Sequence, residues 1–598
     1  MGDFMAPIPM VVIACLLFSL LESKLVLPAH LKRVSIRNGT QESSTFNRWQ
    51  TRVADSIEQA IIRYYRPTLK FCIQHRYSVM AVFIGIFILI LALILSGWTR
   101  FVFFSPVESD TGRVTLTMPI GTPFEVTDRH MQRITQAAIN LQKKYVDGDT
   151  EHPLITSILS TTGSARGHRL ADHLGQVIIQ TIPSDERITD FTTTQLVQEW
   201  RQVIGTIPGA ESVTFRAELF RADDPVNVQI SGTSLQLLSE AAEQVKQRLA
   251  TYPAVFDIAD SLSDGKEELH IELTAQGHVL GLTRAEVVNQ VSQAFKGFEV
   301  QRIQRGRDDV RVIVRLPESE RQRVSTLNEY QISAPDGRRV PLAHVATFTP
   351  NKGPSTITRI DRYRTVNVTA DLDQDKTNMV ALQKDLNQYM DQLMQQYPSL
   401  AYSMEGQERQ QRESFYSMKI GLILLVFAIY GLLALPLKSY IQPLMIMSIV
   451  PFGLIGAVIG HWIMGRDLSF LSTLGLMALI GVVVNDSLVL MDFINRKKAS
   501  GMALYEAVIT AGVARFRPII LTSLTTFFGL LPLIFAKSVQ SQFLIPMSIS
   551  MGFGILFATL ITLLMLPVNV LIVEDIKNWI KRSARSGDPV APIAQDHQ

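Results

Sequence analysis

Cysteine is nearly absent from this sequence, since Cys15 and Cys72 are the only two among 598 residues. Both precede the long region 98–417, which therefore needs no disulfides, and the length of that region allows an ordinary hydrophobic core. The sequence also has no nucleotide-binding glycine loop, no His or Cys cluster at metal-ligand spacing and no nucleophile motif. An enzyme, a bound cofactor and a resident metal ion are therefore not expected.

Net charge is also small, at +3, and does not indicate nucleic acid as a partner. No Lys or Arg precedes the first apolar run, and Glu22 and Lys24 follow it. A signal peptide would show the opposite arrangement, with a basic start and a small-residue cleavage site. The first run is therefore predicted to be a membrane span.

Long apolar runs are what the sequence has in abundance, and 47% of its residues are hydrophobic. A span of about 20 apolar residues crosses a bilayer, so we predict a membrane protein with a seven-span helical bundle. The predicted spans are 1–22 (apolar from residue 4), 78–97, and five more within 418–573, at 418–437, 441–464, 468–491, 518–536 and 544–573.

Lys and Arg are frequent in the segment 23–77, between the first two spans. By the positive-inside tendency this segment and the tail 574–598 are cytoplasmic, and 98–417 lies outside. Apolar residues from Phe46 to Tyr64 recur at helical spacing, and Pro67 is expected to end the pattern. We expect an amphipathic helix that either lies in the membrane interface against lipid or packs on protein.

The outer region combines strand and helix periodicities. Between 108 and 218 the predicted order is βαββαβ, the ferredoxin-like arrangement. A second copy begins in 219–261 and resumes in 350–417, separated by the insertion 262–349, which has strand and helix signals of its own, including a strand at 309–316. The fold class is thus a helical membrane bundle plus an α+β domain of βαβ subdomains, whose two layers form a cleft with movable walls.

Asp486 is the first functional candidate, because it lies with Asn485 and Ser487 at the centre of an apolar span. A carboxylate costs roughly 2.5–3.5 kcal/mol there and usually marks an ion or proton path. The alternative is a polar clasp between helices. Thr522 begins a hydroxyl-rich stretch of the next span, whose hydroxyls either relay protons or bond their own helix carbonyls.

Gly456 and Gly460 form a GxxxG pattern that predicts close helix packing. His461 follows directly and is expected to be structural.

Four long motifs resemble those of the resistance-nodulation-division (RND) efflux permeases of the hydrophobic and amphiphilic compound type, the acriflavin resistance protein-like group. They are GVVVNDSLVLMDFINR at 481–496, RFRPIILTSLTTFFGLLPL at 515–533, IQRGRDDVRVIVRLPESER at 303–321 and SLLESKLVLPAHL at 19–31.

The resemblance covers nearly the whole chain but only about half of a family member, corresponding to the sixth span and spans seven to twelve. It implies that 98–218 is the first porter subdomain, that 219–261 and 350–417 form the second, and that 262–349 is the docking half-funnel. It also implies a trimer in the bacterial inner membrane, joined to a periplasmic adaptor protein and an outer-membrane channel. The resemblance implies that Asn485 stands where the family often has a lysine of the proton relay and that Thr522 matches a threonine of that relay. With Asp486, which lies next to Asn485, these are the proton-relay candidates.

Two departures from the family pattern shape the expected function. The aspartate pair of the fourth family span is absent, so we expect a proton-driven half-transporter that is inactive without the N-terminal half of a permease. The glycine-rich loop that carries phenylalanines in multidrug members corresponds to 161–167, which has none. The alternative is a non-transporting interaction protein, or a truncated fragment, that docks on full-length permeases; a relative involved in protein or lipid export is a weaker third interpretation.

Overall fold

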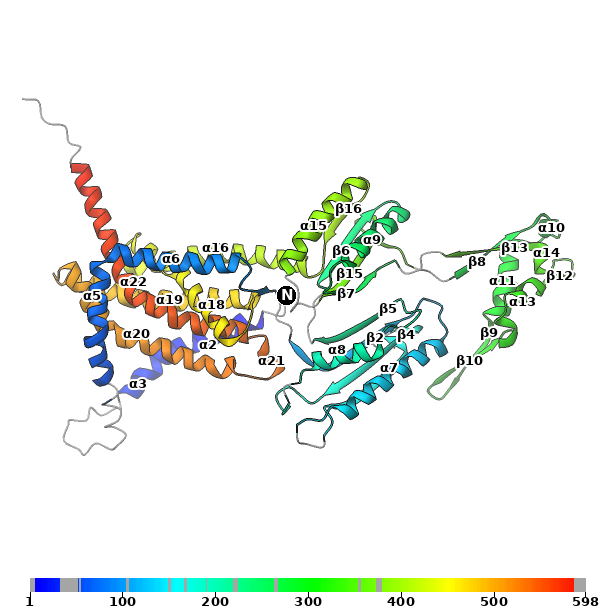
Figure 1. The fold of residues 1–598 in the computed structure, drawn as a ribbon, viewed down its shortest axis with the longest axis horizontal. Coiled ribbons are helices and arrows are strands. Elements are labelled where there is room, and N and C mark those ends of the chain that lie inside the picture. The colour runs from blue at the N-terminus through cyan, green and yellow to red at the C-terminus, as the bar shows by residue number, and fades with distance from the viewer. Residues whose placement is uncertain are drawn as a thin grey trace, which may run out of the picture. The chain divides into compact units, whose positions relative to one another are not determined.

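A computed structural model describes residues 6–32, 52, 55–103, 107–148, 152–165, 169–189, 191–218, 224–262, 267–352, 356–372 and 379–585 (Figure 1). The chain divides into two compact units. One combines Met1–Val82, Asp486–Ser523 and Thr559–Gln598, and the other combines Phe83–Asn485 and Leu524–Ala558.

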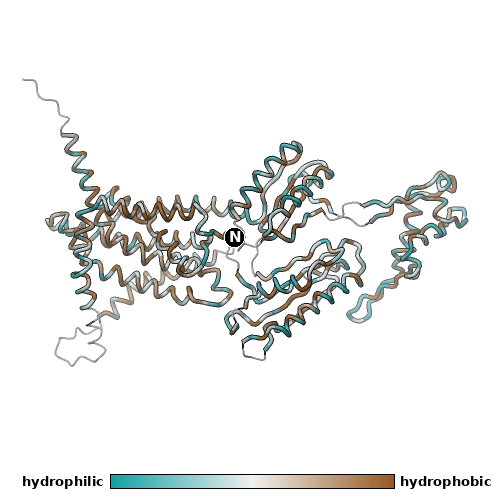
Figure 2. The backbone as a smooth tube through the Cα atoms, in the orientation of Figure 1, coloured by the Kyte–Doolittle hydropathy of each residue, from teal (hydrophilic) through white to brown (hydrophobic). Residues whose placement is uncertain are grey.

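Within the described residues, seven helical segments are long and apolar enough to cross a membrane, and they colour brown along much of their length in Figure 2. The elements that form them are α2 (Pro7–Leu21) with η1 (Glu22–Val26) and α3 (Leu27–Leu31), α6 (Arg76–Leu95), α16 (Gln407–Leu437), α17 (Gln442–Met447) with η3 (Val450–Phe452) and α18 (Gly453–Met464), α19 (Phe470–Ala499), α20 (Leu504–Ile534) and α22 (Ile545–Arg585).

Several of these helices extend beyond the apolar runs that predicted them. The first continues past Glu22 and Lys24 to Leu31, and α20 begins at Leu504, so Pro518 lies inside it. Helix hydrogen bonds are made by the backbone, so a polar side chain ends an apolar run without ending the helix. Proline is tolerated inside such helices where neighbouring groups satisfy the carbonyl it leaves free.

The prediction that Pro67 ends the amphipathic helix is wrong. The helix passes from a π-helical segment, η2 (Ile61–Tyr65), into α5 (Arg66–Gln74), which contains Pro67. The N–H of Arg66 reaches back five residues to the carbonyl of Ile61, and this wider turn leaves room for the proline ring. Phe46, Trp49 and Val53 of the predicted stripe lie outside the described residues.

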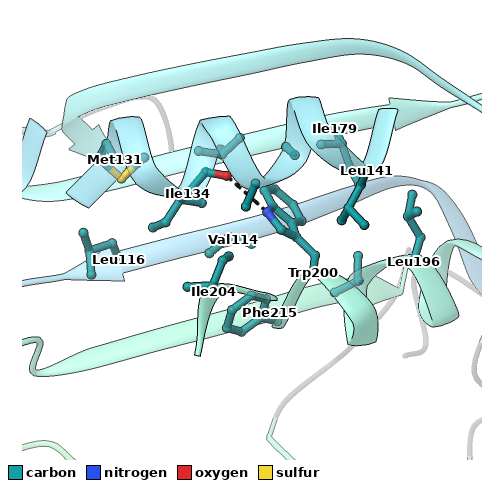
Figure 3. Packing of buried hydrophobic residues seen from close by; sticks show 14 of the residues in the cluster. Val114, Leu116, Met131, Ile134, Leu141, Ile179, Leu196, Trp200, Ile204 and Phe215 are labelled. Carbon is teal, nitrogen blue, oxygen red and sulfur yellow. Dashed lines mark hydrogen bonds between the residues drawn. The ribbon is translucent and has the colours of Figure 1, made fainter. Parts of the chain in front are cut away.

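The first α+β subdomain (107–218) has the predicted order of elements. Its sheet runs β3-β4-β2-β5 with every neighbouring pair antiparallel, and α7 and α8 supply the buried apolar residues that pack on it. Trp200 of α8 is fully buried and donates its indole N–H to the carbonyl of Ile134 on α7 at 3.2 Å (Figure 3). The elements are β2 (Glu108–Thr117), α7 (Phe124–Lys144), β3 (Ile155–Ala165), β4 (Arg169–Thr181), α8 (Thr193–Ile204) and β5 (Ser212–Glu218).

The second subdomain repeats this strand order although its chain is interrupted. Strands β7, β15, β6 and β16 lie side by side in that order, and α9 and α15 contribute to one buried cluster with the sheet. The elements are β6 (Val226–Gly232), α9 (Leu235–Ala250), β7 (Val255–Asp260), β14 (Thr358–Ile360), β15 (Tyr363–Leu372), α15 (Met379–Gln396) and β16 (Ala401–Met404).

The insertion has its own small core, and a turn at Pro335–Gly337 joins β11 to β12. The predicted strand at 309–316 is one arm of a hairpin whose other arm, β9, was not predicted. Every residue of β10 is exposed, so burial gives this hairpin little sequence signature. The elements are β8 (Glu267–Leu273), α10 (Ala275–Val279), α11 (Arg284–Phe295), β9 (Phe298–Arg305), β10 (Asp308–Val314), α12 (Glu318–Arg321), α13 (Ser325–Glu329), β11 (Gln331–Ser333), β12 (Arg339–Pro341), α14 (Leu342–Val345) and β13 (Ala346–Lys352).

The remaining elements are short. Strand β1 (Phe101–Val102) pairs in parallel with β17 (Leu468–Ser469), directly before α19. Helix α21 (Val539–Gln542) lies between α20 and α22 in the chain.

Candidate functional site

Asp486 lies in the middle of α19 and is 6% exposed. The hydroxyl of Ser523 on α20 lies 3.3 Å from its carboxylate oxygen Oδ2 and 2.7 Å from the hydroxyl of Thr559 on α22. Ser523 and Thr559 are buried as well. One carboxylate and two hydroxyls therefore form a polar cluster among three helices that are otherwise mainly apolar.

The Ser523 hydroxyl has one proton and several available acceptors. It can donate to the Asp486 carboxylate, to Thr559, or to the carbonyl of Ile519 at 3.0 Å. A hydroxyl donates one hydrogen bond and accepts two. Ser523 can thus donate to an ionised carboxylate, and after a reorientation of its O–H it can accept a hydrogen bond from a protonated carboxyl without moving any heavy atom.

The partners of Asp486 are neutral. Across the described part of the chain no Lys, Arg or His forms an ion pair with it, and hydroxyl groups supply its hydrogen bonds. Asp492, six residues later on the same helix, is instead only half-buried and is paired with Arg496. A carboxyl group among neutral donors can gain or lose a proton without breaking an ion pair.

Of the three predicted relay residues, Asp486 is buried, whereas Thr522 and Asn485 are exposed. Thr522 is exposed as a residue, although its hydroxyl donates to Ile519 at 2.8 Å and its side chain contacts the Asp486 carboxylate. Asn485 is exposed. Ser523 and Thr559 were not selected from the sequence as relay residues; Ser523 lay within the hydroxyl-rich stretch, and Thr559 had only the weak signal of a hydroxyl inside an apolar run.

His461 has the structural role expected of it. It is fully buried, and its two ring nitrogens lie 2.9 Å from the carbonyl of Ala457 and 2.9 Å from the hydroxyl of Ser472. The glycine pattern beside it also packs as predicted, because a Cβ at Gly456 would lie 2.6 Å from the carbonyl oxygen of Phe553 on α22, too close for any side chain.

A cavity of about 610 Å³ lies where β5 of the first subdomain and β7 of the second line one space. At its wall, Arg201 of α8 donates two hydrogen bonds to Asp257 of β7, at 2.6 and 2.7 Å. The guanidinium also lies 4.5 Å from the ring centre of Phe215 and 4.6 Å from that of Phe256. A bidentate, ring-stacked arginine is among the stronger polar contacts in proteins, so it joins the two subdomains at the predicted cleft.

The predicted loop 161–167 is only partly described. Thr161–Ala165 ends β3, while Arg166 and Gly167 lie outside the described residues. The ring of Phe124, at the start of α7, lies against Gly163, where an added Cβ would be 3.4 Å from it. An aromatic ring thus reaches this place from another element, which inspection of the loop alone did not reveal.

Across the described residues, no group of three or more His, Cys, Asp or Glu side chains is arranged to hold a metal ion.

Comparisons with known proteins relate this geometry to a family. The model of the AcrB/AcrD/AcrF family matches residues 1–574. The chain is also similar to crystal structures of a heavy metal efflux pump. Crystal form I has a TM-score of 0.71 and 19% identity, covering 88% of this chain and 52% of that chain. Crystal form II has a TM-score of 0.69 and 20% identity, covering 86% and 52%. The chain thus spans about half the length of these solved structures, and the low identity establishes a shared fold alone.

Proposed function

The chain belongs to the AcrB/AcrD/AcrF family of RND permeases, and on that premise we propose that it forms the C-terminal half of a proton-driven efflux transporter for hydrophobic or amphiphilic compounds. The observation that carries this proposal is the buried Asp486 carboxylate, which accepts from the Ser523 hydroxyl of α20, itself hydrogen-bonded to Thr559 of α22. Transport coupled to protons needs a group that is protonated and deprotonated in each cycle, and this site supplies one.

In the proposed mechanism, protonation of Asp486 changes which hydrogen bonds join α19, α20 and α22. The ionised carboxylate draws the Ser523 hydroxyl toward itself, whereas the neutral carboxyl releases that hydroxyl to Thr559 or Ile519. Each proton crossing 100 mV supplies about 2.3 kcal/mol. That energy is enough to alter a few hydrogen bonds, and the resulting helix shifts would open and close the cleft between two ferredoxin-like subdomains.

The proposal of a half-transporter rests on coverage and on exposed surface. The matching solved chains are about twice as long. Asn485 and Gly481, one turn apart on α19, are both exposed, and nothing lies within 4 Å of a Cβ built at Gly481. This face would receive the helices of an N-terminal half. We further propose that the seven-span bundle lies in the inner membrane and that the transporter is a trimer. It would work with a periplasmic adaptor and an outer-membrane channel.

The cavity lined by β5 and β7 favours an organic compound as the exported cargo. Its size suits a small molecule, and its wall combines apolar residues such as Ile207 and Val213 with the Arg201–Asp257 pair. This mixture matches an amphiphile, which has an apolar body and a polar or charged end. Metal cargo, which the solved heavy metal efflux pump suggests, is the competing outcome of the test.

The test is export from cells that contain this chain together with the N-terminal half of a family permease. We expect a lipophilic dye to leave these cells, export to need both chains, and a protonophore to stop it. Asp486→Asn, which keeps the shape of the side chain but cannot ionise, should abolish export at equal expression. Asp492→Asn is the matched control, because it changes a half-buried, ion-paired aspartate on the same helix and should leave export intact.

Three results would overturn parts of this proposal. Unchanged export by Asp486→Asn would reassign that residue to helix packing. Resistance of the cells to metal ions without dye export would show that the cargo is a metal ion and not an amphiphile. No export with any partner, together with co-purification with full-length permeases, would favour a non-transporting interaction protein.

A further inference from the structure

The last long helix, α22, contains Pro567. Proline has no backbone N–H, so it cannot bond the carbonyl four residues earlier, which here belongs to Leu563. Leu563 is 1% exposed. A buried carbonyl without a donor costs free energy comparable to a lost hydrogen bond, and the cost rises within a membrane.

The missing donor comes from a residue 498 positions away. The hydroxyl of Tyr65, in η2, donates to the Leu563 carbonyl at 2.9 Å. Tyr65 is 8% exposed, and burial raises the pKa of its phenol well above the ordinary value, so the hydroxyl keeps the proton that it donates. Of the two adjacent tyrosines, Tyr64 is 65% exposed and does not share this environment.

Helix α20 holds Tyr65 from another side. The ring of Phe516 lies 4.4 Å from the Tyr65 ring, centre to centre. A Cβ built at Gly512 would lie 2.9 Å from the Tyr65 hydroxyl and 2.6 Å from Leu69, so only glycine lets α20 approach this closely. The fit is tight enough to fix the hydroxyl on one acceptor.

These contacts fall on α20, which supplies the hydroxyl partners of Asp486, and on α22, which supplies Thr559, the hydrogen-bond partner of Ser523. On α22, Leu563 follows Thr559 by four residues, which is about one helical turn. On α20, Phe516 precedes Ser523 by seven residues, which is about two turns and returns to the same face. Tyr65 therefore bridges α20 and α22 beside the Ser523–Thr559 hydrogen bond.

We propose that Tyr65 is a positioning residue for the Asp486 site. By occupying the carbonyl that Pro567 leaves free, it fixes the local geometry of α22 and, through Thr559 and Ser523, the hydrogen bonds offered to the carboxyl group. A second consequence is that the segment containing η2 and α5 takes part in the function and is not only a membrane contact. This inference rests on the proposed proton-linked function of Asp486.

The experiment is an infrared titration of the full chain in lipid nanodiscs. The carboxyl band of Asp486 is identified by its loss in Asp486→Asn, and its midpoint pH is then measured. Tyr65→Phe removes only the hydroxyl, and we expect the midpoint to shift. Tyr64→Phe is the matched control, with the same chemical change at the exposed neighbour, and should leave the midpoint unchanged.

The rescue variant separates positioning from general disturbance. Pro567→Ala restores a backbone N–H that can bond Leu563, so the Tyr65 hydroxyl becomes dispensable. We expect Tyr65→Phe to shift the midpoint in the parent chain and not in the Pro567→Ala chain. If Tyr65→Phe alone does not fold, recovery of folding and of the parent midpoint in the double variant supports the same conclusion.

The possible outcomes distinguish the positioning role of Tyr65 from the proposed proton-linked function of Asp486. If the Asp486 band titrates but Tyr65→Phe behaves like Tyr64→Phe, or Pro567→Ala gives no rescue, the positioning role is wrong and the proposed function stands. If the parent chain shows no titrating band that Asp486→Asn removes, both fail.

Discussion

The first α+β subdomain and the helices around Asp486 bury polar groups in opposite ways. In the subdomain, the side chain of Arg187 is 4% exposed and pairs with Glu108 at 3.0 Å, while carbonyls such as that of Phe191, at 2.8 Å, take its other protons. In the helices, Asp486 has hydroxyl partners. An ion pair fixes a charge permanently, whereas neutral donors allow it to change. The first arrangement suits a rigid body and the second suits a switch.

The largest expected effect concerns the buried ion pair between Arg187 and Glu108 in the first subdomain. Arg187→Met should destabilise the first subdomain by about 3–5 kcal/mol, because it leaves the Glu108 carboxylate partly buried without its cation. Hydrogen–deuterium exchange of the 107–218 region in the full chain would measure this loss. Arg113→Met, at an exposed position on β2, is the control. Equal protection in both variants would contradict the idea that the pair holds the subdomain together.

At the Asp486 site we expect a loss of export and not a loss of folding. Ser523→Ala removes the hydroxyl between Asp486 and Thr559 and should cost about 1–1.5 kcal/mol, which is about a tenfold loss of proton-driven dye export if that hydrogen bond is used in the slow step. The fold should survive, as judged by expression and thermal unfolding. Ser500→Ala, at an exposed serine just beyond α19, should have no effect. Full export by Ser523→Ala would show that Asp486 acts without this hydroxyl.

Arg201 is expected to have an intermediate effect. Its charge is paired with Asp257, as in an ion pair of the rigid kind, but the pair joins two subdomains. Arg201→Lys keeps the charge but loses the two-pronged bond to Asp257 and the stacking on Phe215 and Phe256. We expect a loss of about 1–2 kcal/mol, seen as faster amide exchange in β5 and β7 with α7 unaffected. Arg216→Lys is the control, because its single contact to Asp224 is long, at 3.5 Å. A uniform change across both subdomains would argue against a local junction.

The smallest expected effect concerns a surface charge and its pH dependence. Hydrogen bonds from Lys144 and Tyr145 hold the pKa of Glu199 below its ordinary value. A carboxyl group with a lowered folded-state pKa adds stability above its unfolded value and loses it as the pH falls through the folded value. Glu199→Gln should therefore lower the unfolding temperature slightly at about pH 7 and not at about pH 3. Glu186→Gln, which removes a carboxylate at an exposed position of the same subdomain, is the control variant.

The sequence predicted the fold well where the signal is local. Apolar runs predicted the seven long helices, and alternation predicted the strand order of 108–218. The prediction failed at the exposed strand β9, which lacks a buried face, and at Pro67, which lies inside a helix. Proline is a reliable helix stop only where no π turn or neighbouring donor compensates for its missing N–H.

The candidate site was predicted only in part. Asp486 was evident because a carboxylate in an apolar run is unusual. Thr522 was selected from the sequence, whereas selecting Ser523 required knowing how α20 is rotated about its axis. That rotation is set by packing contacts such as Gly512 against Leu69. Thr559 and Tyr65 lie on segments far from Asp486 in the chain, so no local pattern links them to it.

The sequence by itself determined which segments are apolar enough to span a membrane, where the strands and helices with a buried face form in 108–218, and that one acid sits among hydrocarbon side chains. These properties follow from composition and periodicity over neighbouring residues. The tertiary structure alone decided that Ser523 meets both Asp486 and Thr559, and that Tyr65 supplies the donor missing at Pro567. The physical reason is that a hydrogen bond depends on direction and distance to within a few tenths of an ångström, and only the packing of whole helices sets those.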